Sequence, residues 1–126
     1  MARRIHVLGA VLFVVVGLAW LAGCSSVGSY GEPITAAKET PISNVLDDPA
    51  SFAGKDLVVT GQIATIDPDG KGFNLDNGRS NLLYCKIGGD FKIPAASRYH
   101  LATVEGKFQV DKEGKAVFEV KGIRVK

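Results

Sequence analysis

The sequence has 126 residues, of which 46% are hydrophobic and 22% are charged. This length suffices for one small domain with its own hydrophobic core and excludes several domains within these residues. The formal net charge is only +2, from 15 basic and 13 acidic residues, which excludes a protein that binds nucleic acid through a large positive charge.

Residues 1–23 have the composition of a secretory signal peptide. Arg3 and Arg4 form a short basic start, an apolar run over residues 7–20 follows, and Ala22-Gly23 supplies the small residues of a cleavage site. The apolar run has about 14 residues, fewer than the roughly 20 that a membrane-spanning helix needs. We therefore expect the segment to be cleaved, and an uncleaved anchor is the alternative.

The signal segment ends in Leu21-Ala22-Gly23-Cys24, which resembles the lipobox of bacterial lipoproteins. The resemblance implies diacylglyceryl transfer to the Cys24 thiol, cleavage before Cys24, and acylation of the new amino terminus, for example with palmitate. Two or more acyl chains on one residue give stable attachment. Ser25 resembles the sorting pattern of enterobacterial lipoproteins, which implies an exported protein on the outer membrane, facing the periplasm, if the source is Gram-negative. An ordinary signal peptide that carries a cysteine is the alternative.

Cleavage before Cys24 would leave 103 residues and change the charge balance. Removing Arg3 and Arg4 from the 15 basic residues leaves 13, equal to the 13 acidic residues. A neutral chain has no strong attraction to polyanions, so we expect lipid rather than charge to hold it on the membrane. Lipidation of Cys24 leaves Cys85 as the one remaining thiol. Its apolar, strand-like surroundings predict an inert buried residue, with a redox role as the alternative.

The chain after the lipobox divides into a tether and a domain. Residues 24–40 are rich in glycine, proline and small residues, and we expect a flexible tether that lifts a domain over residues 41–126 away from the bilayer. Residues 42–52 predict one short helical segment. Ser43 is one candidate N-cap, and Asp48-Pro49 offers another, with proline at the first helical position.

From Asp56 onward the hydrophobic period changes to two, which predicts strands. Five strands are expected, at Leu57 to Ile63, 72–76, about 80–87, 102–110, and from Phe118 to Val125. The turn signals between them are Asp67-Pro68-Asp69-Gly70, the tight-hairpin pair Asn77-Gly78, and Asp111-Lys112-Glu113-Gly114. A change of parity in the last strand predicts a bulge near Gly122, and Gly61 predicts a bulge or bend in the first.

Five strands with glycine bends, and an irregular insert at 88–99 between the third and fourth, predict an all-β, five-stranded OB-fold-like Greek-key barrel. An open meander or an SH3-like barrel is the alternative. The sequence also carries the segments Val59-Thr60-Gly61-Gln62-Ile63, Gly72-Phe73-Asn74-Leu75-Asp76-Asn77-Gly78 and Val104-Glu105-Gly106-Lys107. In these features residues 42–126 resemble small exported bacterial OB-fold proteins, including the bacterial OB-fold (BOF) family. That resemblance implies a binding module of the cell envelope and brings no catalytic motif.

The residues do not form a recognisable catalytic or metal-binding pattern. After residue 23 the chain has a single histidine, His100, and no cysteine cluster, so neither a nucleophile–base pair nor a zinc site is expected. Asp67-Pro68-Asp69-Gly70 resembles the start of a calcium loop, but Gly78 stands where the closing glutamate should be. We expect no enzymatic activity, no cofactor and no metal.

OB-folds commonly bind ligands over their second and third strands and the adjoining turns. On that surface we expect the ligand-binding residues Asn74, Arg79, Tyr84 and Lys86, together with Lys71, Asn81, Lys112 and Lys115. The sequence thus predicts a lipid-anchored, non-catalytic module that binds an envelope protein or a small ligand. An oligonucleotide-binding protein is the alternative, because Tyr84 with Lys86 and Arg79 combines an aromatic ring with basic residues.

Overall fold

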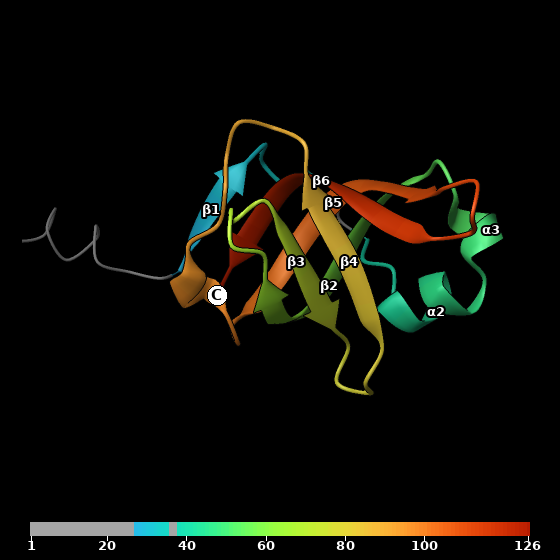
Figure 1. Cartoon of the computed structure of the whole chain (residues 1–126), viewed down its shortest axis with the longest axis horizontal. Helices are drawn as coiled ribbons and strands as arrows, with labels where there is room; N and C mark the ends of the chain where they lie inside the picture. Colours follow the sequence, from blue (N-terminus) through green and yellow to red (C-terminus); the bar gives the residue numbers. More distant parts are fainter. Residues whose placement is uncertain (1–26, 36–37) are drawn as a thin grey trace, which may run out of the picture.

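The computed structural model describes residues 27–35 and 38–126, so the signal segment, the lipobox and Cys24 lie outside the described residues. Within these ranges the chain forms six strands, two short α-helices and one 3-10 turn (Figure 1). In chain order they are β1 Gly28–Gly31, α2 Ile42–Asp47, α3 Pro49–Phe52, β2 Asp56–Ile66, β3 Gly72–Asp76, β4 Leu82–Ile87, η1 Ala95–Ser97, β5 Leu101–Val110 and β6 Ala116–Val125. None of the helices in this part of the chain is long and apolar enough to cross a bilayer.

Strands β2 to β6 close into a barrel. β2 pairs antiparallel with β3, β3 pairs with β4, and β5 pairs with both β2 and β6, while the parallel pair β4–β6 completes the circle. This is the strand order of an OB-fold, so the predicted five-stranded Greek-key barrel is confirmed. The parallel pair brings residues 85–87 beside residues 118–120, which are distant in the sequence.

A bulge in β6 explains its change of parity. Glu105 pairs with Gly122, whereas the next residue, Gly106, pairs with Val120, so Lys121 is the extra residue of β6. An extra residue reverses which side chains face inward on either side of it. The bulge predicted near Gly122 is therefore confirmed.

The barrel interior is filled by apolar side chains from every strand of the barrel. Its largest fully buried members are Phe73, Phe108, Phe118, Ile63, Leu75, Leu83 and Ile123. Ile42 and Val45 of α2 join this core, so the helix closes one end of the barrel. Each large apolar side chain buried in this way stabilises the fold by roughly 1.5–3 kcal/mol.

The helical segment is confirmed, but its first cap is not where the sequence places it. The Pro41 carbonyl accepts the amides of Asn44 and Val45 at 3.1 and 3.4 Å, so α2 already begins at Ile42. Ser43 consequently lies inside the helix, and its predicted role as N-cap is wrong. The second helix, α3, does begin with proline at its first position, after Asp48, as predicted.

Strand β1 lies within the segment that the sequence predicts to be a tether. It pairs antiparallel with β6, from Gly28 opposite Val125 to Gly31 opposite Gly122. The Glu32 amide then continues the pairing by donating to the Lys121 carbonyl at 2.9 Å. The expectation that the whole of residues 24–40 is an unpacked tether is therefore wrong.

The physical reason is that glycine in this segment is compatible with two structures, a flexible linker and a closely packed edge strand. The small residues that suggest flexibility also allow a close approach of two backbones. A Cβ atom on Gly31, in this segment, would stand 2.5 Å from the Lys121 carbonyl oxygen, and a Cβ atom on Gly122, in β6, would overlap the Glu32 carbonyl group, so the close approach of the two strands depends on glycine on both sides. Composition alone does not distinguish this edge strand from a linker.

Two local predictions also need correction. Asn77-Gly78 does not form a two-residue hairpin, because Asp76 pairs with Leu82 across a five-residue loop. The Asn77 side chain organises this loop by accepting the Arg79 amide at 2.8 Å.

Gly61 lies in continuous register with β5, and the shift in β2 occurs between Ile63 and Thr65 instead. Glycine is needed at position 61 for a different reason. A Cβ atom there would stand 2.9 Å from the Asp76 carbonyl oxygen and 3.0 Å from the Ile42 side chain. The residue thus allows close packing and does not mark the bulge.

Candidate functional site

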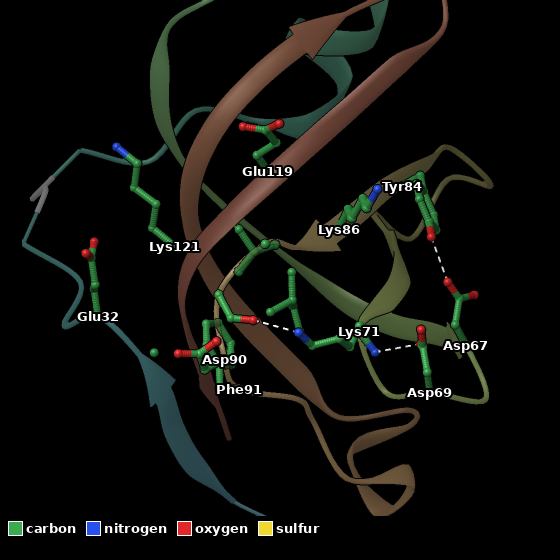
Figure 2. A pocket seen from close by; sticks show the side chains of 15 residues that line it. Glu32, Asp67, Asp69, Lys71, Tyr84, Lys86, Asp90, Phe91, Glu119 and Lys121 are labelled. Carbon is green, nitrogen blue, oxygen red and sulfur yellow. Dashed lines mark hydrogen bonds between the residues drawn. The ribbon is translucent and has the colours of Figure 1, made fainter.

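A groove of about 920 Å³ runs over the outer face of the parallel pair β4–β6. Tyr84 and Lys86 point into it because they alternate along β4 with the buried residues 83, 85 and 87. Lys86 is in register with Glu119 of β6, which also points outward (Figure 2). The groove is lined by Gly31, Glu32, Asp67, Asp69, Lys71, Tyr84, Lys86, Ile87, Gly88, Gly89, Asp90, Phe91, Glu119, Val120 and Lys121.

A hydrogen bond between two side chains fixes the wall formed by the β2–β3 turn. The Tyr84 hydroxyl donates to Asp67 Oδ2 at 2.6 Å, across the first residue of β3 (Figure 2). This hydrogen bond, with partial burial and the charges of Asp67 and Asp69, raises the pKa of Tyr84 to about 12. Tyr84 is therefore a held hydrogen-bond donor that keeps its proton at neutral pH.

Gly72 makes this hydrogen bond possible. It lies directly beneath Asp67 and Tyr84, and a Cβ atom at this position would overlap both the carboxylate and the hydroxyl. Gly72 is itself buried and begins β3. The absent side chain therefore provides the space in which the two polar groups meet.

Lys71 ties the β2–β3 turn to the insert after β4. Its ammonium donates to the Gly89 carbonyl at 2.7 Å, and its backbone amide donates to Asp69 Oδ1 at 2.9 Å. Its carbonyl accepts the Ile87 amide at 2.8 Å. Three contacts at one residue hold the floor of the groove in a single arrangement.

The opposite wall is built by the end of β1 and by Phe91. Gly31 has a φ of +75°, and a Cβ atom there would stand 2.5 Å from both the Lys121 carbonyl oxygen and the Phe91 ring. Asp90 lies beside Phe91 at this side of the groove, and Glu32 lies further to the left in the view, below Lys121 (Figure 2). The Lys121 ammonium forms an ion pair with Asp56 at 3.1 Å.

Acidic side chains outnumber basic ones in the groove. The five carboxylates are Glu32, Asp67, Asp69, Asp90 and Glu119, and the three ammonium groups are Lys71, Lys86 and Lys121. The carboxylates attract cationic groups of a ligand, and the ammonium groups attract its anionic groups. The lining as a whole favours a cationic or mixed-charge ligand over a polyanion.

The structure divides the predicted ligand-binding residues into two groups. Tyr84, Lys86 and Lys71 line the groove. Asn74 is paired with Tyr84 across β3–β4, but its amide donates to Thr65 Oγ1 at 2.8 Å and it does not line the groove. Arg79 is exposed on the 77–81 loop, outside the groove.

The remaining candidates also lie outside the lining: Lys112 and Lys115 belong to the β5–β6 turn, and the neutral Asn81 belongs to the 77–81 loop. Conversely, the sequence reasoning missed Glu119, Lys121 and Phe91. These residues reach the groove through the parallel β4–β6 pairing and the β1 contact, neither of which has a local signal in the sequence. For this part of the groove, the sequence signal is the parity change near Gly122, which indicates the bulge of β6 at Lys121.

Cys85 is buried, and its thiol is directed toward the Leu83 carbonyl at 3.6 Å. Burial raises the pKa of this thiol well above its usual range, so the reactive thiolate is disfavoured. The prediction of a buried core cysteine is confirmed. Within residues 27–35 and 38–126 no group of three or more histidine, cysteine or acidic side chains is arranged to hold a metal ion.

No protein-family model and no curated protein sequence matches this chain. Solved structures are similar to it at low identity. The telomere capping protein Ten1 from Saccharomyces pombe is 18% identical, with 71% of this chain and 81% of Ten1 covered and a TM-score of 0.54. The hypothetical protein YgiW from E. coli is 14% identical, with 79% of this chain and 99% of YgiW covered and a TM-score of 0.52.

Asparaginyl-tRNA synthetase from Pyrococcus horikoshii is 19% identical over 71% of this chain, with a TM-score of 0.53. The chain spans only 23% of that synthetase. At such identities the likeness establishes the fold alone, and a single fold supports many functions. The comparisons and the barrel together identify an OB-fold.

Proposed function

We propose that this chain is a lipid-anchored, non-catalytic OB-fold binding module of the bacterial cell envelope. Its groove over β4–β6 takes a segment of a protein partner, or a small ligand, that carries cationic groups. The preformed groove is the observation that carries the proposal. The attachment rests on the resemblance of Leu21-Ala22-Gly23-Cys24 to a lipobox. The resemblance of Ser25 to the enterobacterial sorting pattern supports a location on the outer membrane, facing the periplasm, in a Gram-negative source.

The fixed geometry of the groove supports a binding role. Tyr84 is held by Asp67, and Lys71 is held by Gly89. A ligand that enters such a site does not have to order these side chains, each of which would otherwise cost roughly 0.5–1.5 kcal/mol of binding free energy. Lys86 and Asp90 are exposed at the groove and free to contact the ligand.

The charge of the lining supports a cationic ligand. Five carboxylates line the groove together with the half-buried Phe91 ring and the Tyr84 side chain. Cationic side chains are attracted by carboxylates and also pack favourably on aromatic rings. A lysine- or arginine-bearing protein segment offers both kinds of group.

An oligonucleotide is the alternative ligand. Tyr84 lines the groove together with Lys71 and Lys86, and single strands bind to surfaces that combine an aromatic ring with basic side chains. The same groove would place five carboxylates beside the phosphates, and their repulsion weakens binding most at low salt. The charge balance therefore favours the protein or small ligand.

Three features support the absence of catalysis. The Tyr84 pKa of about 12 keeps its proton in place, and burial keeps the Cys85 thiol away from substrates. The Nδ1 atom of His100 lies 2.8 Å from the Lys126 carbonyl, on a part of the surface that does not line the groove. None of these groups combines a nucleophile with a base in reach of a ligand.

The binding role can be tested by placing a photo-crosslinking amino acid at position 86 of the full chain in intact cells. The matched control carries it at Lys112, an equally exposed lysine on the β5–β6 turn outside the groove. We expect an adduct at position 86 whose mass is unchanged by nuclease, because the crosslinked partner is a protein or a small ligand. An adduct that nuclease digests would establish the oligonucleotide alternative, and equal labelling at both positions would contradict a role for the groove.

The lipid attachment is tested separately by a Cys24→Ser variant. We expect it to keep its signal segment and to migrate as the longer precursor. Wild-type processing and wild-type membrane retention in this variant would show that Cys24 is not the anchor.

A further inference from the structure

A patch of exposed apolar side chains lies near the first residue of β1, whereas the last residue of β1, Gly31, lines the groove. Val27, Tyr99 and Leu101 are 48%, 64% and 55% exposed. Gly28 and Ala102 both pair with Val125, so the next position of β6, Lys126, lies between Val27 and Leu101. The Lys126 amide donates to the Leu101 carbonyl at 2.9 Å, which continues this row.

Tyr99 is held on the surface by its backbone. Its φ of +72° lies in the left-handed region, which is unfavourable for an aromatic residue. Two contacts to β2 maintain it: the Tyr99 amide donates to the Ile63 carbonyl at 2.7 Å, and the Gln62 side chain donates to the Tyr99 carbonyl at 2.9 Å. Strained backbone of this kind is retained where the surrounding structure fixes it.

Basic side chains accompany the apolar ones. The Arg98 guanidinium lies 4.7 Å from the centre of the Tyr99 ring. Arg124 of β6 and Lys126, which follows the strand, are exposed, and Arg124 is in register with Ser29 and Thr103. Tyrosine and leucine with adjacent arginine and lysine are the side chains that proteins place at the interface between lipid headgroups and acyl chains.

The patch lies close to Cys24 along the chain. Only Ser25 and Ser26 separate Cys24 from Val27, so the Cα atoms of Cys24 and Val27 are at most about 11 Å apart. If Cys24 carries lipid, the start of β1 is held within that distance of the bilayer. The remaining linker is too short to lift the domain away from the membrane.

We infer that Val27, Tyr99 and Leu101, with Arg98, Arg124 and Lys126, form a docking patch that rests on the surface of the bilayer; this inference builds on the proposed lipid attachment. The patch fixes the orientation of the whole domain. β1 leads from Val27 to Gly31 at the groove, a distance of about 13 Å. The groove is therefore presented to partners above the headgroups and not to the lipid.

The test uses the acylated full-length product in vesicles of phosphatidylethanolamine with a minor fraction of phosphatidylglycerol. A nitrobenzoxadiazole fluorophore is attached at Lys126→Cys, and in a control protein at Lys112→Cys. Labelling is specific because the Cys85 thiol is buried. We expect a doxyl-labelled lipid to quench the fluorophore at position 126 roughly threefold more than that at position 112, because only the patch touches the bilayer.

A second comparison isolates the apolar side chains. The double variant Tyr99→Ser, Leu101→Ser should lose most of the quenching at position 126 and remain in the membrane fraction. The matched control is Leu82→Ser, which removes an equally exposed leucine three strands further round the barrel.

Equal quenching at positions 126 and 112, in protein that stays in the membrane fraction, would overturn the docking patch and leave the lipid attachment intact. Unchanged quenching in the double variant would likewise overturn it. A chain with an unmodified Cys24 thiol that washes off the membrane would overturn the attachment, and the docking with it. The two failures are thus distinguishable by the membrane fraction and the mass of the protein.

Discussion

The groove and the docking patch are built in opposite ways, although the same short strand connects them. In the groove, polar side chains are held by hydrogen bonds, such as Tyr84 to Asp67 and Lys71 to Gly89. In the patch, Tyr99 and Leu101 project apolar surface, and the contacts that hold them are made by the backbone. A fixed polar lining suits a specific ligand, whereas projecting apolar side chains suit a surface without fixed geometry.

The difference indicates that β1 does more than extend the sheet. Val27, which directly precedes β1, belongs to the patch, and Gly31, its last residue, belongs to the wall of the groove, so the pairing of β1 with β6 sets the distance between the two. A change that detaches β1 should damage both regions, and a change within one region should leave the other intact.

Detachment of β1 should have the largest effect. A Gly122→Ala substitution would place a Cβ atom against the Glu32 carbonyl group, where there is no space for it. We expect a loss of about 2–3 kcal/mol in the free energy of unfolding, since the backbone of either strand must move. Hydrogen exchange should show faster exchange of the amides of β1 and Glu32.

The matched control is Gly88→Ala. Gly88 also lines the groove, but a Cβ atom there would meet nothing within 4 Å, so its unfolding free energy should change by less than about 0.5 kcal/mol. Wild-type protection of β1 in Gly122→Ala would contradict the assigned role of this strand.

A change confined to the groove is Tyr84→Phe. It removes the hydroxyl that donates to Asp67 and leaves the ring in place, so we expect a loss of about 1 kcal/mol in unfolding free energy. The quenching measured at the docking patch should not change. Reduced quenching would show that the two regions are coupled more tightly than through β1.

The same residue gives a pH dependence with a definite sign. The folded protein holds the Tyr84 proton with a pKa of about 12, above the usual value of 10. The unfolded chain therefore releases this proton first, so the stabilisation is complete below pH 10 and is lost as the pH rises from 10 to 12. Denaturant titrations should show a smaller decline over this window in Tyr84→Phe than in wild type, and an equal decline would contradict the assignment.

A smaller effect, with the opposite sign, is expected on the patch side. The Ser97 hydroxyl, in the turn that precedes Arg98 and Tyr99, is fully buried and has no hydrogen-bond partner among the described residues. Ser97→Ala should therefore stabilise the protein, by up to about 1 kcal/mol, because a buried hydroxyl without a partner is costly. A lower midpoint temperature of thermal unfolding in Ser97→Ala than in wild type would contradict this prediction.

Most of the barrel could be predicted from the sequence because its signals are local. The turn at Asp67-Pro68-Asp69-Gly70 is closed by the Gly70 amide, which donates to the Asp67 carbonyl at 2.9 Å. Strand β3 has the predicted bounds, and the parity change in β6 marks a real bulge. Alternation and turn chemistry depend on neighbouring residues, so they can be recognised without the fold.

The candidate site depended on contacts that are distant in the sequence. Tyr84 and Lys86 could be predicted because OB-folds bind on this face, whereas Glu119 and Phe91 arrive through the β4–β6 pair and the β1 contact. Neither the parallel pairing nor the exposed position of Tyr99 has a periodic signal. The role of Gly122 could not be predicted either, because the carbonyl that excludes a side chain there belongs to Glu32.

The smallest effect on stability is expected from Lys121→Ala. The Lys121 ammonium and Asp56 are 47% and 60% exposed, so their ion pair at 3.1 Å should contribute less than about 0.5 kcal/mol. The alanine retains the backbone carbonyl that receives the Glu32 amide, so β1 should stay in place. A loss above about 1 kcal/mol would instead assign Lys121 a structural role.

Because its fold is preserved, this variant can report on the ligand. Lys121→Ala makes the groove more acidic, which should strengthen the binding of a cationic protein segment and weaken that of an oligonucleotide. Glu119→Gln changes the charge in the other direction at the neighbouring position of the lining and keeps a group that can accept from Gln109. Opposite shifts in affinity for the two variants, both diminished by salt, would establish the sign of the ligand's charge, and shifts in the same direction would exclude charge as the basis of recognition.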